Sequence, residues 1–180
     1  MQKIKYWIYA TRPKTLIASI SPVCITSAFS YRYYHFQWYI FILILVAALL
    51  IQIMTNFIND LYDYKKGSDR EDRKGPDRMI QKGHISENKM KNGIWFVMLL
   101  ATIVGSFLVY IGGLIILFIG LSAFLFSYLY TATKLSIAYN GLGDLFVFVY
   151  FGVIAVLGSY YLQAGFIDQN AIYLGIAIGA

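Results

Sequence analysis

Long apolar runs constrain this chain more than any other feature, because an apolar stretch of roughly 20 residues is the length of a helix that crosses a lipid bilayer. Charged residues make up only 13% of the 180 residues, whereas a soluble domain has roughly 25%. The runs cover approximately Thr15 to Phe29, Trp38 to Asp63, Gly93 to Ile111, Leu114 to Thr133 and Leu142 to Gln163. The sequence therefore predicts an all-α fold, a polytopic transmembrane helical bundle with about five full spans.

The segments between these runs predict how the chain is organised. The Gly112-Gly113 pair is typical of a tight turn between helices, and residues 64–92 are the one long polar loop. Another apolar run begins near Asn170 and continues to Ala180, so we expect the start of a sixth span and a chain that is cut off at its C-terminus. Residues 1–180 are then the N-terminal part of a single membrane-embedded domain, with the 64–92 loop inside it.

The basic residues predict how the bundle lies in the membrane. When the runs are threaded through a bilayer in order, every lysine and arginine except Arg32 falls on the side of the N-terminus and the 64–92 loop. Basic residues are enriched on the cytoplasmic side of membrane proteins. We therefore predict a multi-pass protein of the cytoplasmic (inner) membrane, with the N-terminus and the 64–92 loop in the cytoplasm. No nucleic-acid partner is predicted, and the oligomeric state is left open.

A cluster of oxygen-bearing side chains lies where the second apolar run would leave the bilayer. It consists of Asn56, Asn59, Asp60 and Asp63. Their i, i+3, i+4, i+7 spacing places them on one face of a helix. Gly67 then offers a helix stop, and Asp69 follows it. Because carboxylates at membrane depth are costly and usually serve a function, we interpret this face as a candidate site rather than a solvated surface.

The chemistry of this face favours a phosphate-bearing ligand. Clustered carboxylate and amide oxygens suit Mg²⁺, which binds through one or two carboxylates together with substrate phosphates. The adjacent loop supplies cations for phosphate oxygens, and Arg73, Lys74 and Arg78 stand out because they flank Gly75-Pro76. Together these features predict a lipid diphosphate, with its charged head at the mouth of the bundle and its apolar tail among the helices. The alternative is that the basic residues only set topology and attract anionic lipid.

The connection between the fourth and fifth runs falls on the same side of the membrane. Tyr130 and Lys134 are spaced i and i+4, so a helix end would point them the same way. Lys134 could contact a phosphate and Tyr130 could line the pocket, although an interfacial tyrosine and a snorkelling lysine are strong alternatives. Asp144 lies just inside an apolar run, where the cost of burying a carboxylate favours a functional role.

Several motifs resemble those of the UbiA superfamily of intramembrane prenyltransferases. They are Asn59-Asp60-Leu61-Tyr62-Asp63, Arg12-Pro13-Lys14-Thr15-Leu16, Glu71-Asp72-Arg73-Lys74-Gly75-Pro76, Gln81-Lys82-Gly83, the Tyr130 and Lys134 pair, and the runs Tyr139 to Gly152 and Leu157 to Gln163. Many members of the superfamily have an aspartate where this chain has Gly67. The variant with Asp69 instead is similar to the 1,4-dihydroxy-2-naphthoate prenyltransferase branch. The similarity spans nearly the whole chain.

This resemblance implies a helical intramembrane transferase that uses Mg²⁺ and a polyprenyl diphosphate. In this branch the prenyl group is transferred to the aromatic acceptor 1,4-dihydroxy-2-naphthoate, with loss of its carboxylate, during menaquinone biosynthesis. By carry-over we expect Asp60 and Asp63 to be catalytic, and the metal ligands to be Asn59, Asp60, Asp63 and Asp69. With the reasoning from the residues, the expected substrate-binding residues are Asn56, Arg73, Lys74, Arg78, Tyr130, Lys134 and Asp144.

Three alternatives stay open at this point. The superfamily has a second Asp-rich motif after its sixth helix, which this sequence does not reach, so an inactive truncated remnant or a non-catalytic scaffold is one alternative. A second is a UbiA-type transferase with another aromatic acceptor, because acceptor choice is a property of the pocket. A third is a transporter or channel with the polar face as its cation path. That reading requires polar residues deep within several helices, and the third to fifth runs have almost none.

Overall fold

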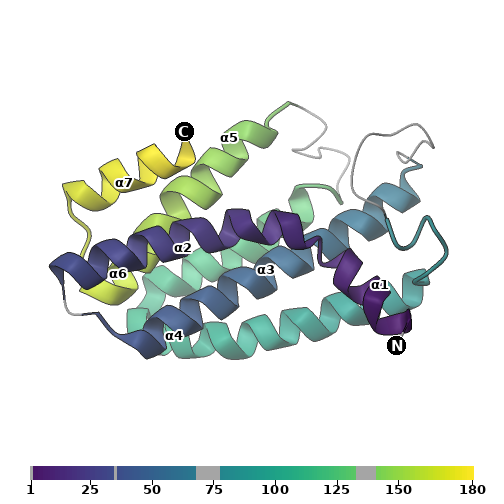
Figure 1. Cartoon of the computed structure of the whole chain (residues 1–180), viewed down its shortest axis with the longest axis horizontal. Helices are drawn as coiled ribbons and strands as arrows, with labels where there is room; N and C mark the ends of the chain where they lie inside the picture. Colours follow the sequence, from purple (N-terminus) through teal and green to yellow (C-terminus); the bar gives the residue numbers. More distant parts are fainter. Residues whose placement is uncertain (1, 35, 68–77, 133–140) are drawn as a thin grey trace.

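A computed structural model describes residues 2–34, 36–67, 78–132 and 141–180. Every regular element in this part of the chain is helical, which confirms the predicted all-α class. The elements are α1 (Gln2–Ala10), α2 (Pro13–Tyr33), α3 (Trp38–Lys65), α4 (Glu87–Leu129), α5 (Gly143–Val147), the π-helix η1 (Phe148–Ile154), α6 (Ala155–Ala164) and α7 (Gln169–Gly179). The long helices lie side by side along the long axis of the molecule (Figure 1).

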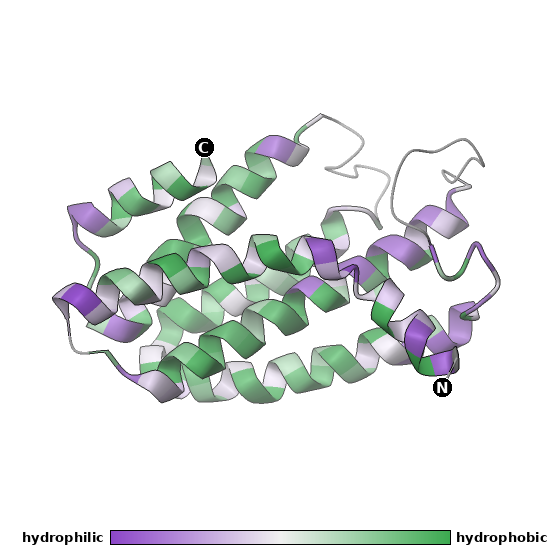
Figure 2. Cartoon of the chain, viewed as in Figure 1, coloured by the Kyte–Doolittle hydropathy of each residue, from purple (hydrophilic) through white to green (hydrophobic). Residues whose placement is uncertain are grey.

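Three of these helices are long and apolar enough to cross a membrane, which makes the chain a multi-pass membrane protein. They are Trp38–Lys65, Glu87–Leu129, and the continuous rod Gly143–Ala164 formed by α5, η1 and α6. Apolar residues cover their length, and hydrophilic residues gather toward the two ends of the molecule (Figure 2). The predicted count of about five full spans is not confirmed, because α2 is long enough but less apolar than these three. Helix α7, with 11 residues, lies where the start of a sixth span is predicted.

Helix α4 contains the turn that the sequence predicts at Gly112-Gly113. Gly113 leaves the helical region, with φ 67° and ψ −153°, a conformation that glycine adopts without a Cβ clash. The chain reverses there: Met98 and Phe124, on opposite sides of the turn, pack against one core cluster, while Leu108 and Ile116 belong to another. The two halves of α4 therefore run alongside each other (Figure 1), as the two predicted runs require.

Local signals set the ends of the helices next to the polar face. Pro13 occupies the first turn of α2, and the preceding Arg12 turns the chain with φ 51°. Helix α3 ends at Lys65, and Gly67 follows with φ 62°, which confirms the predicted helix stop. Helix α4 begins at Glu87, so residues 87–92, assigned to the loop from sequence, are helical. The fully buried Met90 secures this extra turn by packing into the core.

Two hydrophobic clusters fill the bundle, one toward each end. The first joins α3 to the start of α4 and to the segment after residue 78, through Phe57, Leu61, Met79, Ile85 and Met90. The second joins α2, α3, both halves of α4, and α6; its buried members include Val23, Ile40, Ile44, Leu108 and Leu162. The first cluster lies directly under the polar face of α3, so apolar packing fixes the frame on which the polar side chains are held.

The end of the molecule opposite the α1 end is closed by hydrogen bonds between connections. Tyr160 Oη donates to Tyr34 Oη at 2.7 Å, and Tyr34 Oη donates to Asp168 Oδ2 at 2.9 Å. Asp168 also caps α7 by accepting the N–H of Ala171, and this bond lowers the pKa of the Asp168 carboxyl. Gln163 exchanges two hydrogen bonds with the backbone of Gln37. These contacts tie the α2–α3 and α6–α7 connections together.

Helix α7 crosses η1 so closely that only glycine fits at the contact. A Cβ placed on Gly152 would lie 2.4 Å from Gly179 Cα and 2.9 Å from the Gly175 carbonyl oxygen. Gly152→Ala is therefore expected to destabilise the bundle by about 1 to 3 kcal/mol, the usual cost of overpacking, and to lower the thermal unfolding temperature in detergent.

The matched control for this substitution is Gly105→Ala in α4. A Cβ on Gly105 meets no atom within 4 Å, so alanine there should leave stability unchanged or raise it by roughly 0.5 to 1 kcal/mol through its better helix propensity. Equal unfolding temperatures for the two variants would mean that α7 does not pack on η1 in this way.

Candidate active site

The polar face of α3 is the centre of the candidate site, and the structure confirms that its four members share one face. Asn56, Asp60 and Asp63 are buried, whereas Asn59 is only partly buried. Asn56 meets the start of α2 and Asn59 meets the end of α4. Asp60 and Asp63 both meet the segment that begins at Arg78. The face is therefore the point at which three parts of the chain meet at one end of the bundle.

Asn56 links α3 to the start of α2. Its Nδ2 donates to the carbonyl oxygen of Thr11 at 2.8 Å and to Thr15 Oγ1 at 2.9 Å. Its Oδ1 accepts from Gln52 Nε2 at 3.5 Å. With 2% of its surface exposed, Asn56 holds the Arg12–Pro13 corner in place.

Asn59 faces the end of α4. Its Oδ1 accepts a short hydrogen bond from the hydroxyl of the buried Thr131. Lys66, just past the end of α3, donates from Nζ to the carbonyl oxygen of Thr131 at 2.5 Å. Thr131 thus contacts both the Asn59 amide and the Lys66 ammonium group. Thr131 and Lys66 are not among the site residues predicted from sequence, although Thr131 directly follows Tyr130 and Lys66 directly precedes the predicted helix stop at Gly67.

Asp60 is a buried carboxylate whose two oxygens both accept from the backbone. Oδ2 accepts the N–H of Met79 at 3.0 Å, and Oδ1 accepts the N–H of Ile80 at 3.5 Å. Only 2% of the residue is exposed. A buried carboxylate is tolerated when hydrogen bonds replace its water, and here consecutive amides of the 78–80 segment supply them.

Asp63 lies one turn further along α3 and forms an ion pair with Arg78. Arg78 Nη2 is 2.5 Å from Asp63 Oδ2, and both side chains are almost fully buried. Residues 78–80 therefore contact both carboxylates of the face: the Arg78 guanidinium neutralises Asp63, and two backbone N–H groups hydrogen-bond to Asp60. This supply of positive charge matters because carboxylates near a helix C-terminus face the negative end of the helix dipole.

Tyr130 and Asp144 meet where the end of α4 approaches the start of α5. A Cβ on Gly143 would lie 3.5 Å from Tyr130 Oη. Burial raises the pKa of Tyr130, and the negative charge of Asp144 raises it further. Asp144 itself is exposed, so the predicted burial of this carboxylate is wrong. It lies in the first turn of α5, where a negative charge favours the helix N-terminus. The predicted site residues Asp69, Arg73, Lys74 and Lys134 lie outside the described residues.

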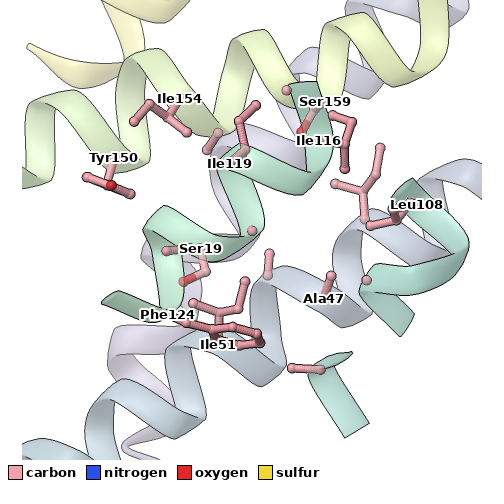
Figure 3. A pocket seen from close by; sticks show the side chains of 18 of the residues that line it. Ser19, Ala47, Ile51, Leu108, Ile116, Ile119, Phe124, Tyr150, Ile154 and Ser159 are labelled. Carbon is pink, nitrogen blue, oxygen red and sulfur yellow. The ribbon is translucent and has the colours of Figure 1, made fainter. Parts of the chain in front are cut away.

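A cavity of about 430 Å³ lies inside the bundle and approaches this face from within. Side chains from α2, α3, α4, η1 and α6 surround it, including Ile51, Phe124 and Tyr150 (Figure 3). None of the described residues that line it is acidic or basic. Thr55 and Ser127 also line it, and their hydroxyls are hydrogen-bonded at 2.8 Å. Asn59 follows Thr55 by one turn of α3, and Thr131 follows Ser127 by four residues, just past the end of α4. Two polar pairs, Thr55–Ser127 and Asn59–Thr131, therefore lead from the cavity to the α3 face.

Comparison with known proteins shows which family this chain resembles. Residues 19–180 match the model of the UbiA prenyltransferase family. The chain belongs to this family. A 1,4-dihydroxy-2-naphthoate octaprenyltransferase of Haemophilus influenzae is 38% identical to this UbiA family chain over 186 residues, which cover 99% of this chain and 60% of the relative.

Two further relatives show how widely this UbiA family sequence is shared. The enzyme of the same name from Escherichia coli is 35% identical, over 91% of this chain and 55% of its own length. The human UbiA prenyltransferase domain-containing protein 1 is 31% identical, over 91% of this chain and 49% of its own length. The chain therefore spans between about half and three fifths of the length of the curated relatives it matches.

The oxygen-bearing side chains of this face are of the kind that suits Mg²⁺. Among the described residues, no three His, Cys, Asp or Glu side chains gather closely enough to hold a metal ion. Asn59 and Asp63 supply an amide oxygen and a carboxylate on one face, a set that suits Mg²⁺ because this ion takes few protein oxygens and completes its shell with water and phosphate. The set does not suit zinc, which prefers nitrogen and sulfur ligands.

Proposed function

We propose that this UbiA family protein transfers a polyprenyl group from a polyprenyl diphosphate to 1,4-dihydroxy-2-naphthoate in menaquinone biosynthesis. The observation that carries the proposal is the junction between the apolar cavity and the polar face of α3. A prenyl diphosphate has an apolar tail and a highly charged head, and the junction offers matching surroundings to both within two helical turns. The names of the bacterial relatives support the naphthoate as acceptor.

The proposed roles follow from where each side chain lies. Asn59 and Asp63 would hold Mg²⁺, together with Asp69 from the segment outside the described residues. Bound Mg²⁺ neutralises charge on the departing diphosphate. Arg78 balances Asp63 in the free protein, and its guanidinium has the forked geometry that phosphate oxygens accept. Lys66, with Arg73, Lys74 and Lys134, would add positive charge around the diphosphate.

The proposed reaction replaces a carbon–oxygen bond by a carbon–carbon bond. The bond between the prenyl C1 and the diphosphate oxygen breaks, and the electron pair leaves with diphosphate. The ring carbon that carries the carboxylate then bonds to C1. Carbon dioxide leaves, and the electrons of its bond restore the aromatic ring, giving the quinol form of demethylmenaquinone. The apolar cavity excludes water, which would otherwise capture the allylic cation, and the nearby rings of Phe146 and Tyr150 can face that charge.

The proposal includes an orientation in the membrane. The described basic residues, apart from Arg32, lie on α1, at the α1–α2 corner, at the end of α3, between Arg78 and Lys82, and at the start of α4. The polar face belongs to the same end (Figures 1 and 2). By the positive-inside rule this end faces the cytoplasm, where a water-soluble diphosphate product can leave. The absence of acidic and basic residues from the described cavity wall argues against the cation-path alternative.

The test is a transfer assay in membranes that contain the protein, with farnesyl diphosphate as donor and 1,4-dihydroxy-2-naphthoate labelled in its carboxylate. We expect Mg²⁺-dependent release of labelled carbon dioxide in equal amount to the prenylated product, and no transfer to 4-hydroxybenzoate. Transfer to 4-hydroxybenzoate alone would identify another acceptor class. Prenylation of the naphthoate without release of carbon dioxide would contradict the proposed chemistry.

A further inference from the structure

Asp60 contacts the backbone of the segment that follows residue 78. Its two oxygens accept the N–H groups of Met79 and Ile80, at 3.0 and 3.5 Å, next to the ion pair between Asp63 and Arg78. Two N–H groups that converge on one carboxylate form charge-assisted hydrogen bonds, which are stronger than bonds between neutral groups. Both Asp60 oxygens are directed at this segment, and the residue is 2% exposed.

The segment that Asp60 holds is compact and packed into the core. The carbonyl oxygen of Met79 accepts from the N–H groups of His84 and Ile85, at 3.0 and 3.1 Å, and closes a turn. Met79, Ile80 and Ile85 are buried in the cluster that contains Phe57 and Leu61 of α3. Because the segment is a tight unit, fixing its backbone at Met79 and Ile80 also fixes the preceding residue, Arg78.

From this geometry we propose that Asp60 is a positioning residue, not a metal ligand: it anchors the 78–85 segment to α3 and so places the Arg78 guanidinium against Asp63. The value of this placement for catalysis rests on the proposed function, whereas the anchoring itself does not. This role differs from the expectation from sequence, in which the resemblance to the UbiA superfamily placed Asp60 among the metal ligands with Asn59, Asp63 and Asp69.

The chemistry explains why a carboxylate is needed at this position. Asp60 offers one acceptor oxygen to each of two neighbouring N–H groups. Asparagine would offer one oxygen and turn its NH₂ group toward the second N–H, leaving two donors face to face in a buried site. Asp60→Asn therefore keeps the size of the side chain, while it removes the negative charge and one of the two acceptor oxygens that hold the segment.

Hydrogen exchange of the 78–85 segment tests the proposal in the whole chain, in detergent or nanodiscs. In Asp60→Asn we expect the amides of Met79 and Ile80 to exchange at least about tenfold faster than in the wild type, the effect of losing a hydrogen bond to a charged group. The matched control is Asp63→Asn, in which Asp60 still holds both amides and their protection should persist. Unchanged exchange in Asp60→Asn would overturn the proposal.

Binding of farnesyl diphosphate with Mg²⁺ separates the anchoring role from a ligand role. If Asp60 anchors the segment, Asp60→Asn should weaken farnesyl diphosphate binding while the Mg²⁺ concentration for half-maximal binding stays unchanged. Asp63→Asn should raise that Mg²⁺ concentration. Equal increases in both variants would make Asp60 a metal ligand and overturn the proposal.

Hydrogen exchange of the wild-type protein, with and without ligand, gives a further test that does not depend on how a variant folds. When Mg²⁺ and farnesyl diphosphate bind, an anchoring Asp60 keeps its bonds, so exchange at Met79 and Ile80 should stay constant or slow down. Faster exchange at these amides on binding would show that Asp60 releases them to the ligand, which would overturn the proposal. If the protein binds no prenyl diphosphate at all, the proposed function fails, while the exchange measured in Asp60→Asn still decides the anchoring.

Discussion

Replacing Asp63 by alanine is expected to abolish Mg²⁺-dependent binding of farnesyl diphosphate to this protein and, with it, prenyl transfer. Asp63 is the carboxylate of the polar face that pairs with a side-chain cation, and that cation, Arg78, is itself proposed to bind the diphosphate. A metal contact to a charged ligand is worth several kcal/mol, so affinity should fall by at least about 100-fold. Equilibrium binding of radiolabelled farnesyl diphosphate, with Mg²⁺ and with excess chelator, measures the effect.

The matched control for this variant is Asp168→Ala. Asp168 is also an aspartate with hydrogen-bonded partners, but it lies at the opposite end of the bundle, on Tyr34 and the start of α7. Its replacement should loosen α7 and leave diphosphate affinity unchanged. Binding by Asp63→Ala that equals the wild type, or wild-type binding that is indifferent to the chelator, would remove the basis for a metal site on α3.

Replacing Arg78 by leucine is expected to have the second-largest effect, on stability as well as on binding. The substitution leaves the Asp63 carboxylate buried without its guanidinium partner, and breaking a buried ion pair from one side costs about 3 to 5 kcal/mol. It also removes a cation from the proposed diphosphate site. We expect a lower thermal unfolding temperature in detergent together with weaker binding of farnesyl diphosphate.

A double variant separates the two effects of Arg78. In Asp63→Asn combined with Arg78→Leu, neither charge of the pair remains, so much of the lost stability should return, because the large cost comes from an uncompensated buried charge. Binding should not return, since both groups proposed to handle the diphosphate are absent. If the double variant is as unstable as the sum of the single variants, the ion pair does not carry the effect.

Helical periodicity predicts which residues of α3 belong to the candidate site. The spacing of Asn56, Asn59, Asp60 and Asp63 is enough to place them on one face, and Gly67 is enough to end the helix beyond them. The Gly112-Gly113 pair likewise predicts the reversal inside α4. These features are local, so residues close in the sequence determine them.

Periodicity does not say what each side chain on that face touches. The backbone N–H groups of Met79 and Ile80 carry no sequence signal, because every residue except proline has one. Their position over Asp60 depends on the packing of Met79, Ile80 and Ile85 into the core. For the same reason, sequence does not show that Asn56, predicted to bind substrate, donates its hydrogen bonds to Thr11 and Thr15. Thr131 likewise becomes a partner of Asn59 only because the end of α4 packs beside α3.

Asp144 shows a second limit of sequence reasoning. Its place at the edge of an apolar run suggests burial, but the exposure of a residue in the first turn of a helix depends on how the neighbouring elements pack. Here the first turn of α5 leaves Asp144 exposed while Tyr130 approaches Gly143. The count of about five spans is not confirmed for a related reason, because a run of apolar residues does not reveal whether α2 crosses the bilayer fully.

The pairing of Asp60 and Asp63 with residues 78–80 has a consequence for the order in which the protein is assembled. Asp60 is separated from Met79 by only 19 residues, and contacts between near neighbours in the chain form early. The residues of the 78–80 segment that contact both carboxylates are therefore synthesised before α4 to α7. The nascent protein can form the Asp63–Arg78 ion pair and the hydrogen bonds to Asp60 before the ribosome has made the remaining walls of the cavity.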